Sequence, residues 1–152
     1  MNYNSPPEKT VEKKFDHEKL EVYRYELEFI GWVTPLLDEA SASAKGRTRE
    51  VCDQLDRASL SALLNTAEGN GKRQRQVRAK FFDDARGSAT ECAACLDALV
   101  AKRVVPADRI GEGKNLLLKI VSMLSGLVNR FDGLNDMLRE DSAEYLAETE
   151  KI

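Results

Sequence analysis

Apolar side chains recur at intervals of three and four residues in four long stretches of this sequence, and only short polar segments separate them. The stretches cover residues 15–40, 48–67, 74–102 and 107–131. This spacing places the apolar side chains on one face of an α-helix, and no stretch shows the alternation typical of a β-strand. Because the connections are short, successive helices should run antiparallel. The sequence therefore predicts an all-α protein, an antiparallel up-down-up-down four-helix bundle.

The first stretch contains a start signal and a proline. Asp16 is the predicted N-cap, and Pro35 either kinks the helix or begins a new one with Thr34 as its cap. One apolar stripe follows Asp16: Leu20, Tyr23, Leu27 and Ile30. We expect a helix that begins near Asp16, with its continuity at Pro35 left open.

The second predicted helix carries two apolar stripes instead of one. The first stripe contains Val51, Leu55, Ala58 and Ala62, and the second contains Leu60, Leu63, Leu64 and Ala67. The fourth helix has a second row as well, made of Leu116, Val121 and Val128. A helix in a monomeric bundle normally buries one face, so a second stripe indicates a subunit interface. The sequence therefore predicts a cyclic homo-oligomer.

The chain divides into three parts. At 152 residues it has the size of one domain, and residues 15–131 form the predicted bundle. Residues 1–14 contain Ser5-Pro6-Pro7 and little apolar periodicity, so we predict a disordered N-terminal arm. Residues 132–152 hold seven acids and two cations, a net charge of −5, and we predict an acidic C-terminal tail, either a frayed helix or disordered.

The composition indicates a soluble, cytoplasmic protein. Residues 1–14 are too polar for a secretory signal, and no apolar run approaches the roughly 20 residues that span a bilayer. The three cysteines are an odd number and are expected to be reduced. A net charge of −3 excludes a simple polycation, but it does not exclude a local basic patch.

The residue types needed for catalysis or metal binding are too few. His17 is the only histidine, which leaves no second ligand for a zinc-protease helix or a di-iron bundle. Cys92 and Cys95 have C-x-x-C spacing, but they lie within a helix, without a second pair or a nearby histidine. Gly69 and Gly71 join two helices, whereas a nucleotide-binding glycine loop joins a strand to a helix. We therefore predict a protein that is not an enzyme and has no metal or cofactor.

A basic segment connects the second and third predicted helices. Between residues 69 and 86 there are six cations and two acids. Four of the cations cluster at the start of the third helix: Lys72, Arg73, Arg75 and Arg78. Such side chains supply most of the non-specific affinity for nucleic-acid phosphates. The alternative is a solvated turn with no ligand.

Arg86 lies between apolar residues in the third helix. With the turn centred near residues 70–73, an antiparallel pairing places Arg86 opposite Asp56, and Cys92 opposite Cys52. We predict a structural ion pair between Asp56 and Arg86 that sets the register of the two helices. A ligand-binding role for Arg86 is the alternative.

Several short motifs occur in order between about residue 15 and residue 131. They are Phe15-Asp16, Leu20-Glu21-Val22-Tyr23, Gln54-Leu55-x-Arg57-Ala58, Asn65-x-Ala67-Glu68-Gly69-x-Gly71, Ala85-Arg86-Gly87-Ser88-x-x-Glu91 and Met123-Leu124-x-Gly126-Leu127. Together these motifs resemble a known family, the four-helix bundle proteins encoded in intervening sequences of bacterial 23S rRNA genes.

The resemblance implies an antiparallel four-helix bundle that assembles as a homopentameric ring or barrel. The fold is also similar to the accessory protein of diversity-generating retroelements, a pentamer that binds nucleic acid and a reverse transcriptase. The intervening-sequence family itself has no settled biochemical activity. Three functions remain open: a nucleic-acid-associated module that contacts RNA or DNA, a structural or protein-partner scaffold, and an accessory partner of a reverse transcriptase.

Overall fold

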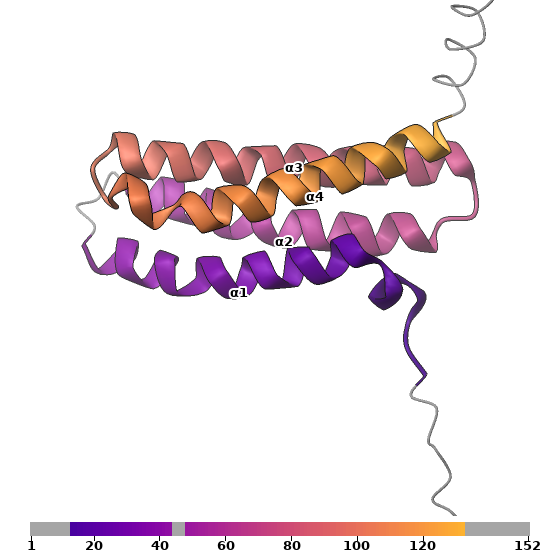
Figure 1. Cartoon of the computed structure of the whole chain (residues 1–152), viewed down its shortest axis with the longest axis horizontal. Helices are drawn as coiled ribbons and strands as arrows, with labels where there is room; N and C mark the ends of the chain where they lie inside the picture. The colour runs from indigo at the N-terminus through magenta and orange to yellow at the C-terminus, as the bar shows by residue number, and fades with distance from the viewer. Residues whose placement is uncertain (1–12, 44–47, 133–152) are drawn as a thin grey trace, which may run out of the picture.

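Helices account for all the regular structure in the part of the chain that the computed structural model describes, residues 13–43 and 48–132 (Figure 1). The four long helices are α1 (Glu21–Ala42), α2 (Arg49–Gly71), α3 (Arg75–Ala101) and α4 (Gly111–Phe131). Two short 3-10 helices precede α1 and α4: η1 (Asp16–Lys19) and η2 (Ala107–Arg109). The prediction of an all-α protein with four helices is confirmed. Residues 1–12 of the predicted N-terminal arm and residues 133–152 of the predicted acidic tail lie outside the described residues.

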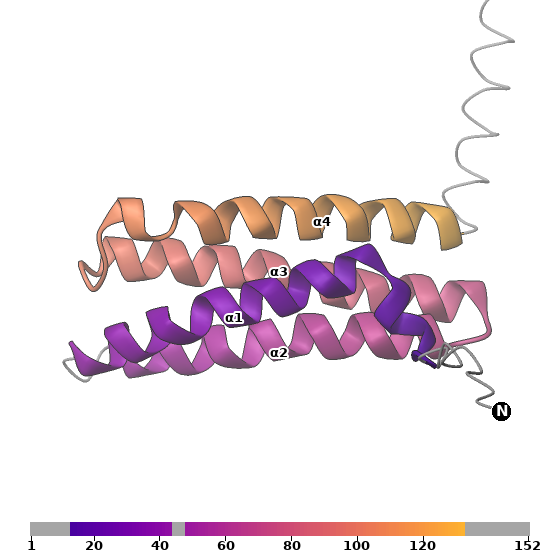
Figure 2. The same cartoon turned by 60° about the horizontal axis from the view of Figure 1, so that its bottom comes forward.

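Each long helix packs mainly against two others. α3 lies between α2 and α4, and α1 lies against both α2 and α4, as the two views in Figures 1 and 2 show. One end of the bundle therefore gathers the start of α1, the connection between α2 and α3, and the end of α4. The opposite end gathers the end of α1, the start of α2, and the connection between α3 and α4.

One continuous core of apolar side chains runs between the four helices. Its largest fully buried members come from all four: Val33, Leu36, Leu55, Phe82, Leu96, Leu99, Ile120 and Leu124. Burial of such side chains stabilises each by about 1.5–3 kcal/mol relative to exposure. The apolar periodicity of the sequence is therefore explained by this core.

The two predicted stripes of α2 differ in burial. Leu55 and Ala58 of the first stripe lie in the core, whereas Leu60 and Leu64 of the second are 51% and 54% exposed. In α4 the outcome is different, because Leu116, predicted in a second row, is buried in the core of its own chain. Only α2 therefore presents large apolar side chains of its second stripe to the outside.

The helix α1 buries a different face from the one that the sequence indicated. Its buried residues are Val22, Glu26, Phe29, Val33, Leu36 and Ala40. Leu27, a member of the predicted stripe, is exposed. Glu26 lies at a core position although it is a charged residue type, so it interrupts the apolar pattern of the buried face. The neighbouring stripe that contains Leu27 therefore looks more continuous in the sequence. The predicted stripe was wrong for this reason.

The start and the continuity of α1 are also settled. Asp16 begins η1 instead of capping α1, because Leu20 takes an extended conformation (φ −72°, ψ 128°) between the two elements. Pro35 lies inside α1, which continues without a restart to Ala42. Pro35 is exposed, and the Thr34 hydroxyl donates to the Ile30 carbonyl oxygen at 2.7 Å.

Two glycines allow close contacts between helices. A Cβ at Gly69 would lie 2.8 Å from Cβ of Phe81, so the missing side chain lets α2 approach α3. A Cβ at Gly113 would lie 2.1 Å from the Trp32 ring, so α4 accommodates that ring. Gly71, which the sequence also placed at the turn, has open space around it.

None of the helices in residues 13–43 and 48–132 combines the length and the apolar character that a bilayer crossing requires.

Candidate nucleic-acid interface

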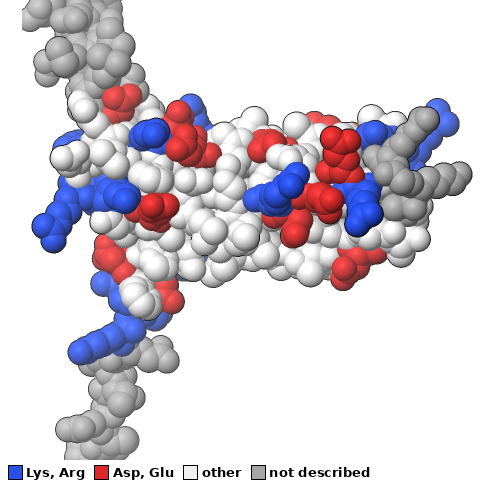
Figure 3. All heavy atoms as spheres, turned by 180° about the vertical axis from the view of Figure 1, so that it is seen from behind, with Lys and Arg blue, Asp and Glu red and all other residues white. Residues whose placement is uncertain are grey.

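The four predicted phosphate-binding cations lie together at one end of the bundle. Lys72 follows the last residue of α2, Arg73 lies in the connection, and Arg75 and Arg78 occupy the first turns of α3. Arg130, near the end of α4, joins them through a contact with Arg75. We call these five residues the basic end. Figure 3, which views the molecule from behind, shows Lys and Arg side chains at its left-hand end, with Asp and Glu side chains beside them.

Phe131 is the centre of the basic end. The guanidinium carbons of Arg75, Arg78 and Arg130 lie 5.3, 4.5 and 5.4 Å from the centroid of its ring. The ring itself packs against Phe82 of the core, with centroids 6.0 Å apart. An aromatic ring attracts a cation electrostatically and neutralises none of its charge. Phe131 therefore holds three guanidinium groups in place while their charge remains available.

Arg78 is the most constrained of the three. Its Nη2 donates to Asn70 Oδ1 at 3.1 Å, and Asn70 Nδ2 in turn donates to Asp16 Oδ2 at 3.0 Å. Its Nε is buried and has no hydrogen-bond partner among the described residues. A buried donor without a partner is costly, so this guanidinium has unused hydrogen-bonding capacity.

Lys72 and Arg73 are held more loosely. Lys72 Nζ lies 5.2 Å from the centroid of Phe81 and 3.7 Å from Glu68 Oε1. That ion pair is well exposed on both sides, so it contributes little to stability. Arg73 is exposed, and none of the described carboxylates pairs with it. Both side chains can turn toward a ligand without breaking a strong contact.

The backbone at the start of α3 adds a second positive feature. Helix α3 has Arg75 as its first residue and no acid in its first turn, and its N-cap Gln74 makes no side-chain capping hydrogen bond. A helix N-terminus carries unpaired N–H groups and a partial positive charge, which favour an anion. Cations at this position are repelled by the partial positive charge of the helix N-terminus. A bound anion would reduce this repulsion and would also accept hydrogen bonds from the unpaired N–H groups.

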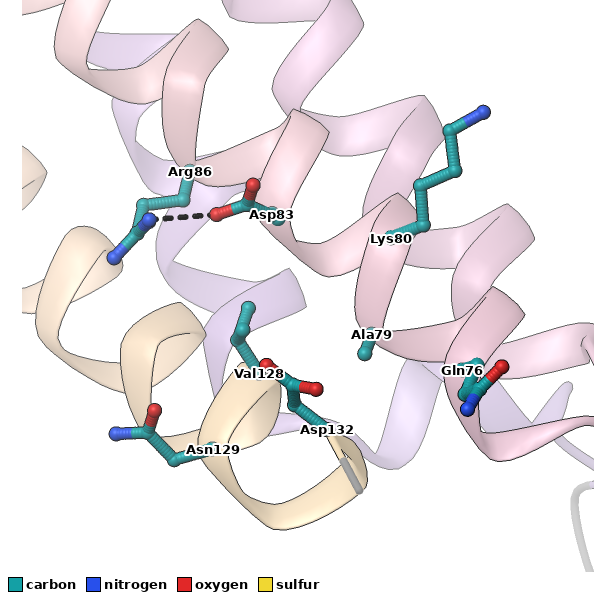
Figure 4. A pocket seen from close by; sticks show the side chains of 8 residues that line it. All are labelled: Gln76, Ala79, Lys80, Asp83, Arg86, Val128, Asn129 and Asp132. Atoms are coloured by element: carbon teal, nitrogen blue, oxygen red, sulfur yellow. Dashed lines mark hydrogen bonds and ion pairs between the residues drawn. The ribbon is translucent and has the colours of Figure 1, made fainter. Parts of the chain in front are cut away.

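A polar hollow lies beside the basic end, between α3 and α4 (Figure 4). Its lining carries charges of both signs: Gln76, Ala79, Lys80, Asp83, Arg86, Val128, Asn129 and Asp132. Arg86 Nη2 is 2.6 Å from Asp83 Oδ1, and Arg86 Nη1 is 3.4 Å from Ser125 Oγ of α4. The hollow is thus electrostatically mixed, unlike the basic end.

The predicted ion pair between Asp56 and Arg86 is wrong. Arg86 pairs with Asp83 on its own helix, and Asp56 lines a separate hollow between α1 and α2. The physical reason is that the Arg86 side chain lies toward Ser125 of α4. The turn also differs from the prediction, because α2 continues through Gly71 and the connection is centred near Arg73. Contacts between α2 and α3 follow this later register, and Gln54 donates to Glu91 while Ser61 lies 2.9 Å from Ser88.

The cysteines are buried free thiols. Burial raises the pKa of Cys92 to about 12 and also raises the pKa values of Cys52 and Cys95. High pKa values leave few thiolates, so these side chains pack as small apolar groups. Across residues 13–43 and 48–132, His, Cys, Asp and Glu side chains form no cluster of three or more that could hold a metal ion.

One buried carboxyl group lies in the core between α1 and α2. Glu26 is 2% exposed, and the Thr66 hydroxyl donates to its Oε2 at 2.9 Å, while Oε1 has no partner in the described part of the chain. Burial raises the pKa of Glu26 to about 8, and the hydrogen bond from Thr66 opposes this shift only in part. Glu26 is therefore mostly neutral at pH 7.

A comparison with protein families identifies the relatives of this chain. The family model described as 23S rRNA-intervening sequence protein matches residues 18–126. The chain belongs to the 23S rRNA-intervening sequence protein family. No curated protein matches the chain. The family assignment made from the short motifs is confirmed, and the match includes Lys72, Arg73, Arg75 and Arg78 but not Arg130 or Phe131.

Sequence reasoning found four of the five cations of the basic end in this intervening sequence protein, and it missed the fifth, Arg130, and the ring of Phe131. Arg130 and Phe131 are separated from Arg75 by more than fifty residues, so no local motif connects them. The available signal was topological: in an antiparallel bundle, the end of the fourth helix lies beside the turn between the second and third. Glu26 was missed because a carboxylate is rarely expected in a core.

Proposed function

We propose that this chain is a non-catalytic, cytoplasmic, nucleic-acid-associated module that binds RNA or DNA phosphates at its basic end. The proposal is supported by the charge arrangement of Lys72, Arg73, Arg75, Arg78 and Arg130. It is also consistent with a family described by its association with 23S rRNA genes.

The convergence of three guanidinium groups on Phe131 is the observation that carries the proposal. Most of their planar N–H groups are not paired with carboxylates, and the ring limits their rotational freedom. A guanidinium that is already positioned loses less entropy when it binds a phosphate, and its fork of donors matches two phosphate oxygens. The N-terminus of α3 adds backbone donors at the same place.

Assembly would strengthen such a site. We propose an up-down-up-down antiparallel bundle that forms a cyclic homo-oligomer, a homopentamer in line with the family resemblance, with Leu60 and Leu64 of α2 at the subunit interface. A closed ring covers an apolar stripe on every subunit and leaves no open edge. It also repeats the basic end around an axis, so weak single sites combine into a multivalent surface.

A titration tests the nucleic-acid proposal. Labelled single-stranded RNA of mixed sequence and a DNA duplex are each titrated with the protein at 50 and 200 mM salt. We expect binding that weakens steeply with salt, because phosphate contacts release counterions. Absence of binding to both probes at 50 mM salt would contradict the proposal.

A matched pair of variants locates the site. Lys72→Gln with Arg73→Gln removes two cations of the basic end, whereas Arg49→Gln with Lys102→Gln removes two exposed cations near the opposite end. The first variant should lose affinity and reduce the salt slope by about 1.5, as expected for two lost phosphate contacts. The second should bind as the wild type does, and equal losses would place the binding elsewhere.

The second candidate function is a scaffold that binds only proteins, including the role of an accessory partner of a reverse transcriptase. The half-exposed Leu60 and Leu64 favour it, because apolar side chains on a helix surface are typical of protein interfaces. Size-exclusion chromatography with light scattering distinguishes self-association from a monomer near 17.0 kDa. Recovery of one specific protein, with no RNA or DNA binding, would favour the scaffold.

A further inference from the structure

We propose that the C-terminal segment, residues 133–152, binds the basic end of its own bundle and competes there with nucleic acid. The regulatory consequence rests on the proposed function, whereas the docking itself does not. The occupant of the basic end in the free protein is therefore a part of the same chain.

Four of the five cations of the basic end form no ion pair with a carboxylate of the described residues. Within residues 13–43 and 48–132, Arg75, Arg78 and Arg130 contact an aromatic ring or neutral oxygens, and Arg73 has no ion pair. Lys72 alone among the five forms an ion pair with a described carboxylate, that of Glu68. Unpaired cations that face water at one end of a helix bundle are suited to an anionic segment.

The segment that follows has the complementary charge. Residues 133–152 contain six acids and two cations, a net charge of −4, in a chain whose total is −3. The acids are Asp136, Glu140, Asp141, Glu144, Glu148 and Glu150. The remaining 132 residues therefore carry a net charge of +1, and the excess negative charge of the protein lies entirely in its last twenty residues.

Residues 133–152 are attached to the chain next to the basic end, so their binding there is intramolecular. Phe131, the centre of the basic end, is one residue from Asp132, and the Arg75 guanidinium donates to the carbonyl oxygen of Arg130. Twenty residues can extend up to about 70 Å, which is ample for a segment attached next to the basic end. A segment tethered this closely has an effective concentration of the order of millimolar, so individually weak ion pairs are sufficient.

An apolar hollow beside Arg130 gives the segment a second contact. It lies between the start of α1 and the end of α4, lined by Leu20, Glu21, Val22, Met123, Gly126, Leu127 and Arg130. The segment contains apolar side chains between its acids, among them Leu138, Tyr145 and Leu146. The segment would place its acids on the guanidinium groups and its apolar side chains in this hollow at the same time.

A charge-neutral tail in the full-length protein tests the competition. The variant carries D136N, E140Q, D141N, E144Q, E148Q and E150Q. The matched control neutralises six exposed acids on the bundle: E28Q, D38N, E50Q, D53N, D108N and E112Q. Both variants gain the same charge, so a general electrostatic effect is equal in the two. We expect the tail variant to bind a single-stranded RNA roughly three- to tenfold more tightly than the control at 100 mM salt. Equal affinities would overturn the competition.

Cross-linking tests the docking without any nucleic acid. A carbodiimide joins an amine to a carboxylate that it contacts, with loss of water, so Lys72 should form an amide with an acid of residues 133–152. We expect this product in the monomer band of a denaturing gel, and its loss in 1 M salt. No such product, or products only between chains, would overturn the inference. If neither the wild type nor the tail variant binds RNA while the intramolecular product forms, the proposed function fails and the docking stands.

Discussion

Cations at one end of the bundle pair with carboxylates, whereas most cations at the other end contact an aromatic ring or neutral oxygens. At the end where α1 finishes and η2 lies, Arg109 donates to Glu39 through Nε and Nη2, at 3.0 and 3.1 Å, and lies 5.5 Å from the centroid of Trp32. Lys114 pairs with Asp97 at 2.6 Å nearby. At the basic end, an aromatic ring also receives the guanidinium groups, but no carboxylate completes the arrangement around Phe131 among the described residues.

The comparison shows that an aromatic ring positions a cation, and that a carboxylate decides whether its charge remains available. The hydrogen bond from Arg109 lowers the pKa of Glu39, and Glu39 raises that of Arg109, so each charge satisfies the other. Arg75, Arg78 and Arg130 share one ring and leave the ligand side open. We call the pair of Arg109 and Glu39 the clasp, because its charges are used within the fold. The arginines around Phe131 are instead suited to binding.

The largest expected effect concerns Glu26, which lies toward the basic end. Its folded pKa of about 8 exceeds the unfolded value of 4.5, so its contribution to stability is complete below pH 4.5 and is lost as pH rises through 8. Relative to Glu26→Gln, the wild type should lose up to about 1.4 kcal/mol of unfolding free energy per pH unit in that window. Urea unfolding of both proteins between pH 5 and pH 9 measures the difference. Parallel pH profiles would show that Glu26 is ionised in the folded state.

The second prediction compares the two aromatic platforms. Phe131→Ala should destabilise the bundle by about 2 kcal/mol, since the ring is partly buried, and should weaken RNA binding roughly tenfold by releasing three arginines. Trp32→Ala should cost a similar amount of stability and leave RNA binding unchanged, because Arg109 remains paired with Glu39. Thermal unfolding and RNA titration of both variants check this. A loss of affinity in Trp32→Ala would remove the distinction between the ends.

A third prediction concerns the contact that brings α2 and α3 together at the basic end. Gly69→Ala should destabilise the protein by about 1–2 kcal/mol, because the new Cβ would overlap Cβ of Phe81. Gly87→Ala is the matched control in α3, and it should stabilise by about 0.5–1 kcal/mol, since open space surrounds that position. Denaturant unfolding measures both changes, and the same sign for both would contradict the close approach.

The smallest effect is expected at the clasp. The pKa of Glu39 is lowered, so its contribution to stability is present above pH 4.5 and is lost as pH falls through the folded value. Arg109→Gln should return the carboxyl pKa of Glu39 upward, as measured by its NMR titration. The effect on stability should be slight, because Glu39 is exposed. An unchanged Glu39 titration would show that the pair is not formed in solution.

Much of the fold was predictable from local patterns. The ends of α3 were placed within one residue, because Gln74 and the polar residues after Ala101 interrupt a clear apolar period. α2 extends four residues beyond its predicted end, through Gly69 and Gly71, since packing against Phe81 and Phe82 compensates for poor helix propensity. The partner of Arg86 was not predictable in this way, because its side chain lies toward α4 and pairs with Asp83 of its own helix instead of Asp56.

The sequence by itself determined that this is an all-α chain with four helices, a member of the intervening-sequence protein family, and that cations gather between its second and third helices. Tertiary structure alone decided which face of α1 is buried and which residues complete the basic end. The physical reason is range: helix periodicity and charge are properties of neighbours in sequence, whereas Phe131 meets Arg78, and Thr66 meets Glu26, only after the helices pack.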